Sequence, residues 1–94
     1  MDRVAAIREN LTTALSPQYL EIIDDSHKHV GHAGAAAGGG HFSVVIVSEQ
    51  FAEQSTLQRH RLVYAAVDKL MPAEIHALSI KAMTPEEQLS QHGA

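Results

Sequence analysis

The sequence contains no cysteine and no tryptophan among its 94 residues. Missing cysteines exclude disulfide bonds, a thiol nucleophile and any metal site built only from thiolates of this chain. Long apolar runs are also missing, since no stretch approaches the roughly 20 apolar residues of a membrane-spanning helix. The N-terminal residues lack the apolar core and the small-residue cleavage site of a secretory signal. We therefore expect a cytoplasmic protein that does not associate with membranes.

Positive charge is scarce as well. Seven Lys and Arg residues stand against eleven Asp and Glu residues, which gives a formal net charge of −4 at pH 7 with histidine neutral. Affinity for nucleic-acid backbones comes largely from clustered cations, so this composition disfavours a general nucleic-acid binder. The length suits one domain with one modest core. Histidine is the exception to this composition, because the chain has seven of them and they require an explanation.

Apolar periodicity and turn residues predict one α+β domain in the order helix, strand, strand, helix, strand. The predicted elements are a helix over 3–15, strands over 19–25, 41–48 and 77–83, and a helix over 54–71. Ser16-Pro17 ends the first helix, because a residue before proline avoids the α region. Thr84-Pro85-Glu86-Glu87 resembles a capping box and predicts a short C-terminal helix.

The predicted second helix has an apolar face with helical spacing. Its members are Leu57, His60, Val63, Tyr64, Val67 and Leu70. A histidine within such a face is more often packed and hydrogen-bonded than a metal ligand, so we expect a structural role for His60.

A long connection of about fifteen residues, from Ser26 to Gly40, separates the first two predicted strands, and connections of this length are usually functional or disordered. Its second half, AGAAAGGG, reads as a flexible insertion, and its glycines precede a strand rather than a helix, unlike a phosphate-binding loop. Its first half carries His27, His29 and His32 beside Lys28. Metal binding and a cationic surface both remain open for this cluster.

Three further histidines lie in or near predicted regular elements. His41 opens the second strand as either a ligand or a surface residue at a strand edge, and we favour the surface residue. His76 starts the third strand, where period two places it on one face with the apolar residues that follow, although a strand end lets the side chain reach solvent. His92 lies in the C-terminal tail and is expected to be solvated. No local spacing matches a closed zinc site or a nucleophile setting, so the residues alone predict no catalytic chemistry.

Several blocks, in the right order, resemble the BolA-like family. Residues 20–26 resemble its first strand, residues 40–48 its second strand, residues 51–64 its signature and residues 75–85 its C-terminal block. The resemblance covers about residues 3–86. One departure is Glu53, because the family often has glycine two residues after the signature Phe51. Glutamate takes a positive φ less readily than glycine, so the departure bears on the turn before the second helix.

The resemblance implies a class II KH-like α+β fold with a mixed three-stranded sheet and helices on one face. It implies a domain over 1–86 and a short tail over 87–94. It also implies a non-enzymatic function, since BolA-like proteins pair with monothiol glutaredoxins and share a [2Fe-2S] cluster with them in cluster trafficking and in iron or stress signalling. By family position the first ligand falls on His76 and the second on His29, with His27 and His32 as alternatives.

This assignment is chemically coherent. Two neutral imidazoles do not close a four-coordinate site, so thiolates of the glutaredoxin and of its bound glutathione would supply the remaining ligands. Histidine in place of thiolate raises the reduction potential and couples it to pH. Without its partner, the chain is expected to be a monomer or a weak homodimer.

The same resemblance implies a second function, because some family members are described as DNA-binding transcriptional regulators. The candidate DNA contacts are Arg59, Arg61 and Lys69 of the predicted second helix. A solvated helix face explains the same residues. No glycine loop of the kind that clamps nucleic acid in KH domains is visible. At a net charge of −4, binding to duplex DNA alone is expected to be weak and sensitive to salt.

Overall fold

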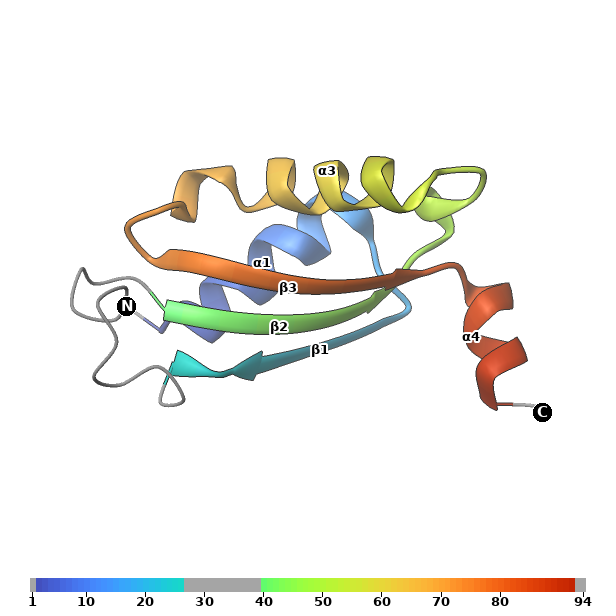
Figure 1. The fold of residues 1–94 in the computed structure, drawn as a ribbon, viewed down its shortest axis with the longest axis horizontal. Coiled ribbons are helices and arrows are strands. Elements are labelled where there is room, and N and C mark those ends of the chain that lie inside the picture. Colours follow the sequence, from blue (N-terminus) through green and yellow to red (C-terminus); the bar gives the residue numbers. More distant parts are fainter. Residues whose placement is uncertain (1, 27–39, 93–94) are drawn as a thin grey trace.

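The computed structural model describes residues 2–26 and 40–92, which form a three-stranded sheet with helices. The elements are α1 (Arg3–Leu15), β1 (Tyr19–Asp24), β2 (Gly40–Val47), η2 (Glu49–Phe51), α3 (Thr56–Ala66), η3 (Asp68–Leu70), β3 (Ile75–Met83) and α4 (Pro85–His92). β2 is the central strand, antiparallel to β1 and parallel to β3. The α+β class, the element order and the mixed sheet are confirmed (Figure 1).

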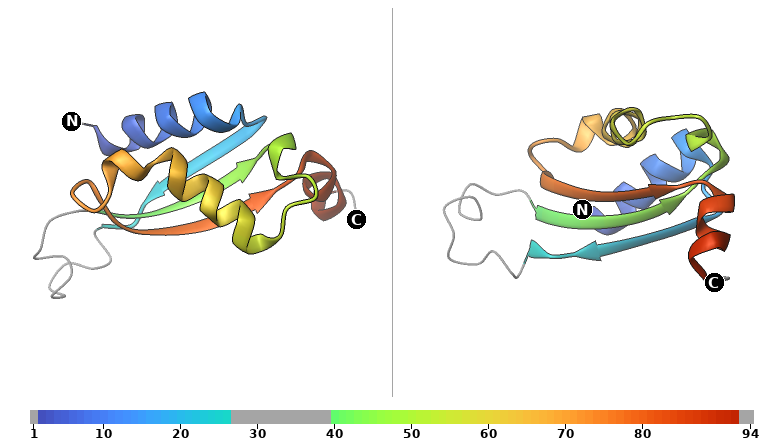
Figure 2. Two further views of the ribbon diagram at one scale, coloured as in Figure 1. Left: turned by 90° about the horizontal axis from the view of Figure 1, so that it is seen from above. Right: turned by 45° about the vertical axis from the view of Figure 1, so that its right-hand side comes forward.

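The core lies between the sheet and the two long helices. Phe42, Val44 and Ile46 alternate along β2 and are at most 2% exposed. Opposite them, Ile7 and Leu11 of α1 are fully buried, as the spacing in the sequence predicts. Figure 2 shows α1 and α3 side by side over the strands, while α4 stands at the end of the sheet.

The second helix is shorter than the predicted 54–71. A capping box starts it at Ser55, whose hydroxyl accepts from the Gln58 N–H while the Gln58 side chain accepts from the Ser55 N–H. α3 ends at Ala66, and a 3-10 turn follows. The predicted apolar face is correct at its C-terminal end but wrong at Leu57 and Tyr64, which are 59% and 38% exposed. Periodicity misplaces the face because Arg59, in the first turn of α3, turns its polar side chain toward β3 and α4.

The turn before α3 forms even though Glu53 stands where the family often has glycine. Glu53 has a φ of 64°, in the left-handed region that side chains other than glycine adopt at a cost. The backbone thus keeps the conformation that glycine would favour, with the strain carried by one residue.

The C-terminal helix is confirmed. The Thr84 hydroxyl accepts from the Glu87 N–H, and the Glu87 carboxylate accepts from the Thr84 N–H, as in a capping box. α4 continues past residue 86, the expected end of the domain. Within the part of the chain that the structure describes, no helix is long and apolar enough to cross a membrane.

Candidate functional site

One end of the sheet brings together the residues that border the long connection. The His41 N–H donates to the Ser26 hydroxyl at 3.1 Å, and the Asp25 N–H donates to the His41 carbonyl at 2.7 Å. The Ser26 N–H in turn donates to the Asp24 carboxylate at 2.9 Å. These bonds hold the end of β1 against the start of β2.

Gly40 lies where neighbouring atoms leave no room for a side chain. A Cβ built on Gly40 would lie 2.5 Å from the Phe42 ring and 2.8 Å from the Ser26 hydroxyl oxygen. The Gly40 N–H also donates to the carbonyl of Glu74, just before β3. Any other residue would have to displace the ring of Phe42 and the Ser26 hydroxyl, which accepts from the His41 N–H.

His76 lies at an irregularity of the sheet next to this junction. Gly40 is paired with Ile75 but His41 with Ala77, so His76 is the additional residue where the register shifts. Bulges of this kind redirect a side chain and are common beside functional sites. His76 is exposed, as a strand end allows, whereas Leu78 is buried. The register shift interrupts the period of two between Gly40 and His41 of β2 and their partners in β3.

His41 also differs from its prediction as a surface residue at a strand edge. It lies in the central strand, is half-buried, and its Nε2 atom is buried. Its ring contacts that of His76, with centroids 5.2 Å apart and planes tilted by 49°. Two imidazoles far apart in the sequence therefore meet at one end of the sheet.

The other predicted metal ligands, His29 and its alternatives His27 and His32, lie outside the described residues. The described residues that border them, Ser26 and Gly40, both lie at the end of the sheet that carries His76. Within residues 2–26 and 40–92, no three His, Cys, Asp or Glu side chains are grouped closely enough to hold a metal ion. The imidazoles within those ranges would thus need further ligands from outside them.

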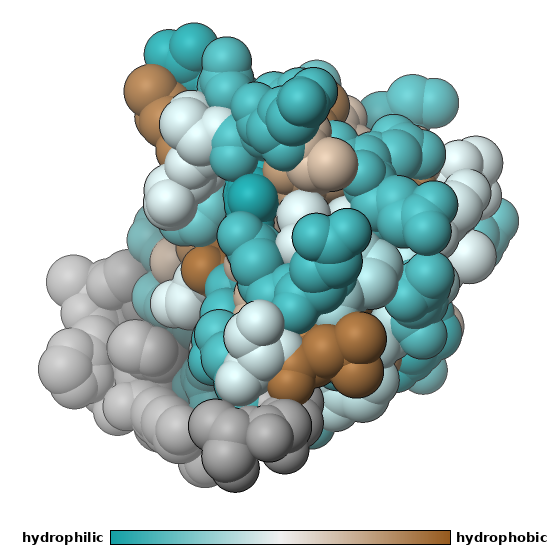
Figure 3. Space-filling view, turned by 90° about the vertical axis from the view of Figure 1, so that its right-hand side faces the viewer, coloured by the Kyte–Doolittle hydropathy of each residue, from teal (hydrophilic) through white to brown (hydrophobic). Residues whose placement is uncertain are grey.

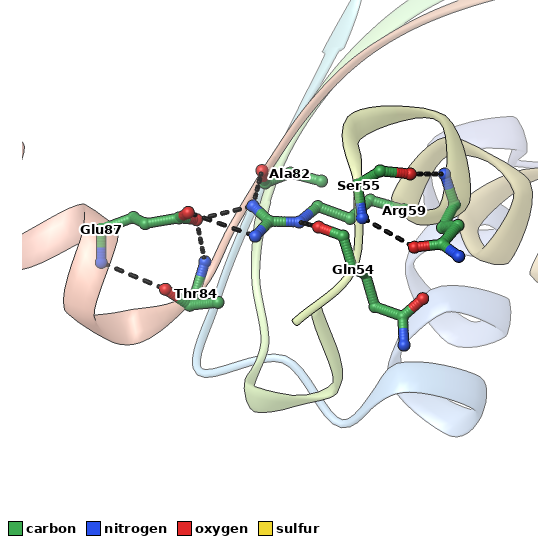
Figure 4. A network of polar contacts seen from close by, with 7 residues as sticks. Gln54, Ser55, Arg59, Ala82, Thr84 and Glu87 are labelled. Carbon is green, nitrogen blue, oxygen red and sulfur yellow. Dashed lines mark hydrogen bonds and ion pairs between the residues drawn. The ribbon is translucent and has the colours of Figure 1, made fainter. Parts of the chain in front are cut away.

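Arg59, a predicted DNA contact, takes part in an internal network (Figure 4). Its guanidinium donates to the carbonyls of Gln54 and Ala82 at 2.9 and 3.1 Å, and to both Glu87 carboxylate oxygens at 2.6 and 3.1 Å. The side chain is only 14% exposed. Hydrogen bonding from Arg59 and from the Thr84 N–H lowers the pKa of Glu87 from 4.5 to about 2. These contacts tie α3, β3 and α4 together.

The remaining predicted DNA contacts, Arg61 and Lys69, are exposed on α3 and η3. His60 is half-buried on α3, and His92 lies in α4.

Figure 3 shows the end of the molecule that carries α4, where the surface is mostly hydrophilic and apolar side chains are scattered. Leu89 of α4, at 71%, is among the exposed apolar residues. Sequence reasoning missed the Arg59 network because its members are far apart along the chain.

The architecture defines a small α+β domain with a mixed three-stranded sheet and a histidine pair at one end of it. The sequence profile of the BolA-like protein family matches residues 11–87. This chain belongs to the BolA-like family.

Relatives and solved structures agree with this assignment. BolA-like protein 1 of Mus musculus is 46% identical over 83 residues, covering 88% of this chain and 58% of the mouse protein. The chain therefore spans less than two thirds of that relative. The DNA-binding transcriptional regulator BolA of Escherichia coli (strain K12) is 36% identical, covering 86% of this chain and 74% of that protein. The BolA domain of SufE1 from Arabidopsis thaliana has a TM-score of 0.82 at 41% identity, covering 93% and 96% of the two chains.

Proposed function

We propose that this chain is a non-enzymatic adaptor for iron–sulfur handling. It binds a monothiol glutaredoxin and completes a shared [2Fe-2S] cluster through two histidines, in cluster trafficking or in iron or stress signalling. The observation that carries the proposal is the position of His76. Its imidazole is exposed at a bulge, next to Ile75, which pairs with Gly40 at the end of the histidine-bearing connection. A ligand at this place can reach a metal centre that a partner presents.

The donor set supports a shared site rather than a site of this chain alone. His76 supplies one imidazole, and family position assigns the second to His29, with His27 and His32 as alternatives. A [2Fe-2S] cluster takes two terminal ligands on each iron, so besides the two imidazoles the glutaredoxin cysteine and its bound glutathione supply two thiolates. Neutral imidazole also makes binding of the cluster sensitive to pH.

The test is an anaerobic titration of this protein into a cluster-loaded monothiol glutaredoxin, followed by visible circular dichroism. We expect the spectrum to change and to saturate at a fixed ratio, because ligands from this chain replace others on the cluster. His76→Ala should abolish the change and leave the far-ultraviolet spectrum intact. His60→Ala, which alters a histidine of α3 instead, is the matched control. An unchanged spectrum with the wild-type protein contradicts the proposal.

DNA binding is the second candidate function, and the name of the Escherichia coli relative favours it. Arg61 and Lys69 are the predicted DNA contacts that are exposed and can meet phosphate. Replacing Arg59 would not test DNA binding cleanly, because it would also remove the hydrogen bonds to Glu87. Arg61→Ala should weaken binding to promoter-length DNA and reduce its salt dependence, whereas Lys81→Ala on β3 should not. No binding by the wild-type chain near physiological salt would count against this function.

A further inference from the structure

The outer edge of β1 is the part of the sheet that another strand can extend. β2 lies between β1 and β3, so β1 and β3 are the two edge strands (Figure 1). The edge of β3 carries side chains of α3, since the Tyr64 hydroxyl donates to the Leu78 carbonyl at 3.1 Å. Arg59 likewise donates to the Ala82 carbonyl at 3.1 Å. We propose that the edge of β1 binds the same edge of a second copy of this chain, in an antiparallel pair that joins the two sheets. This inference does not depend on the proposed function.

The pairing of β1 with β2 determines which backbone groups of β1 point outward. Asp25 and His41 form a hydrogen-bonded pair, since the Asp25 N–H donates to the His41 carbonyl. Such pairs alternate with non-bonded pairs along an antiparallel ladder, so Leu20, Ile22 and Asp24 direct their N–H and C=O groups away from β2. An edge of this kind is a template for another chain, and natural edges are commonly protected by lysine, proline or a bulge. β1 contains neither residue, and its register with β2 is regular throughout.

Charge complementarity favours a second copy as the partner of this edge. A two-fold axis at Ile22 pairs Ile22 with its equivalent and Leu20 with Asp24 of the second copy, so all three outward-facing residues find partners. Arg8 of α1 already lies at this edge, because its guanidinium donates to the Leu20 carbonyl at 3.4 Å. Asp24 lies on the same side of the sheet, where it lines a hollow together with Arg3 of α1. The pairing therefore brings Arg8 of each copy to Asp24 of the other, which gives two ion pairs by symmetry.

An exposed apolar side chain of β1 lies on the opposite face of the sheet, and the same pairing shields it. Ile23 is 46% exposed, whereas its neighbour Ile22 is half-buried on the side of the helices. With the axis at Ile22, Ile23 lies next to Glu21 of the second copy and is the diagonal neighbour of its own equivalent. A six-residue strand on each side gives a small interface, so we expect a reversible dimer that forms as the protein concentration rises.

Charge reversal tests this pairing, with sedimentation velocity over a wide range of protein concentrations as the measurement. Arg8→Glu alone and Asp24→Arg alone each place like charges opposite one another twice, so each should weaken self-association by about tenfold or more. An equimolar mixture of the two variants restores both ion pairs and should form a heterodimer as tight as the wild-type homodimer. Arg61→Glu and Asp68→Arg make the same changes of charge at exposed positions of α3 and η3, and they should gain nothing on mixing. A wild-type chain that stays monomeric, or a mixture that associates no better than its components, overturns the proposal.

A single cysteine provides a second measurement that leaves Arg8 and Asp24 unchanged. The chain has no cysteine, so Ile22→Cys introduces its only thiol. The Cα atoms of a hydrogen-bonded antiparallel pair lie about 5.5 Å apart, within the range of roughly 4.4–6.8 Å that disulfides span. Mild oxidation should therefore link two copies through residue 22, whereas Ser79→Cys, at an exposed position of β3, should form linked dimers much more slowly. Equal rates for the two variants would refute pairing at the edge of β1. Far-ultraviolet circular dichroism confirms that each variant is folded.

Discussion

Neutralising Glu87 tests the network that joins α3, β3 and α4. Its carboxylate receives two hydrogen bonds from Arg59 and one from the Thr84 N–H. Glu87→Gln removes the charge but keeps a side-chain oxygen that can accept from Thr84. The substitution therefore removes the charge and the hydrogen bond that Oε2 accepts from Arg59, and it spares the cap of α4.

The magnitude follows from the pKa of Glu87, which folding lowers from 4.5 to about 2. At about 1.36 kcal/mol per unit of pH, this difference corresponds to roughly 3.4 kcal/mol. The Glu87 side chain is 46% exposed, however, so water screens the interaction. Exposed ion pairs contribute about 0–1 kcal/mol, and the bidentate geometry places this one near the upper end. We expect Glu87→Gln to lower the free energy of unfolding by about 1 kcal/mol at pH 7.

The sign of the pH dependence follows from the lowered pKa. The stabilisation is complete above the unfolded-state pKa of 4.5 and is lost as the pH falls toward about 2. Urea unfolding of both proteins between pH 7 and pH 3 should therefore show a difference that shrinks as acid is added. Glu86→Gln, in the same turn of α4, is the control. A difference that stays constant with pH, or an equal effect of Glu86→Gln, would refute the reasoning.

Three further substitutions test local features of the fold. Gly40→Ala should lower the free energy of unfolding by about 1–3 kcal/mol in urea, because its Cβ would overlap the buried Phe42 ring; equal stability would show that the Phe42 ring moves aside without cost. Glu53→Gly should raise it by about 0.5–1 kcal/mol in thermal unfolding by relieving a φ of 64°, whereas Glu53→Ala should not. Ser48→Ala should lower it by about 1–3 kcal/mol, because the hydroxyl of Ser48, 1% exposed, donates to the Leu15 carbonyl at 2.7 Å; an unchanged urea midpoint would contradict that cost.

The elements that could be predicted from the sequence are those set by local patterns. Ile7 and Leu11 repeat at helical spacing in α1, and the alternation along β2 places Phe42 in the core. The cap at Thr84 is likewise a local signal, and the structure confirms it. The predicted apolar face of α3 is wrong at its start because Arg59 donates to the carbonyl of Ala82. These two residues are far apart in the sequence, so a local pattern does not predict their contact. Apolar Leu57 is consequently left exposed.

For the candidate site, too, local patterns predict only what does not depend on the pairing of strands. His76 could be placed at the start of a strand, but its exposure depends on a register shift that exists only when β2 and β3 pair. His41 was read as a surface residue because the sequence does not show that β2 is central. Pairing in the sheet is what turns these two residues into neighbours, with ring centroids 5.2 Å apart.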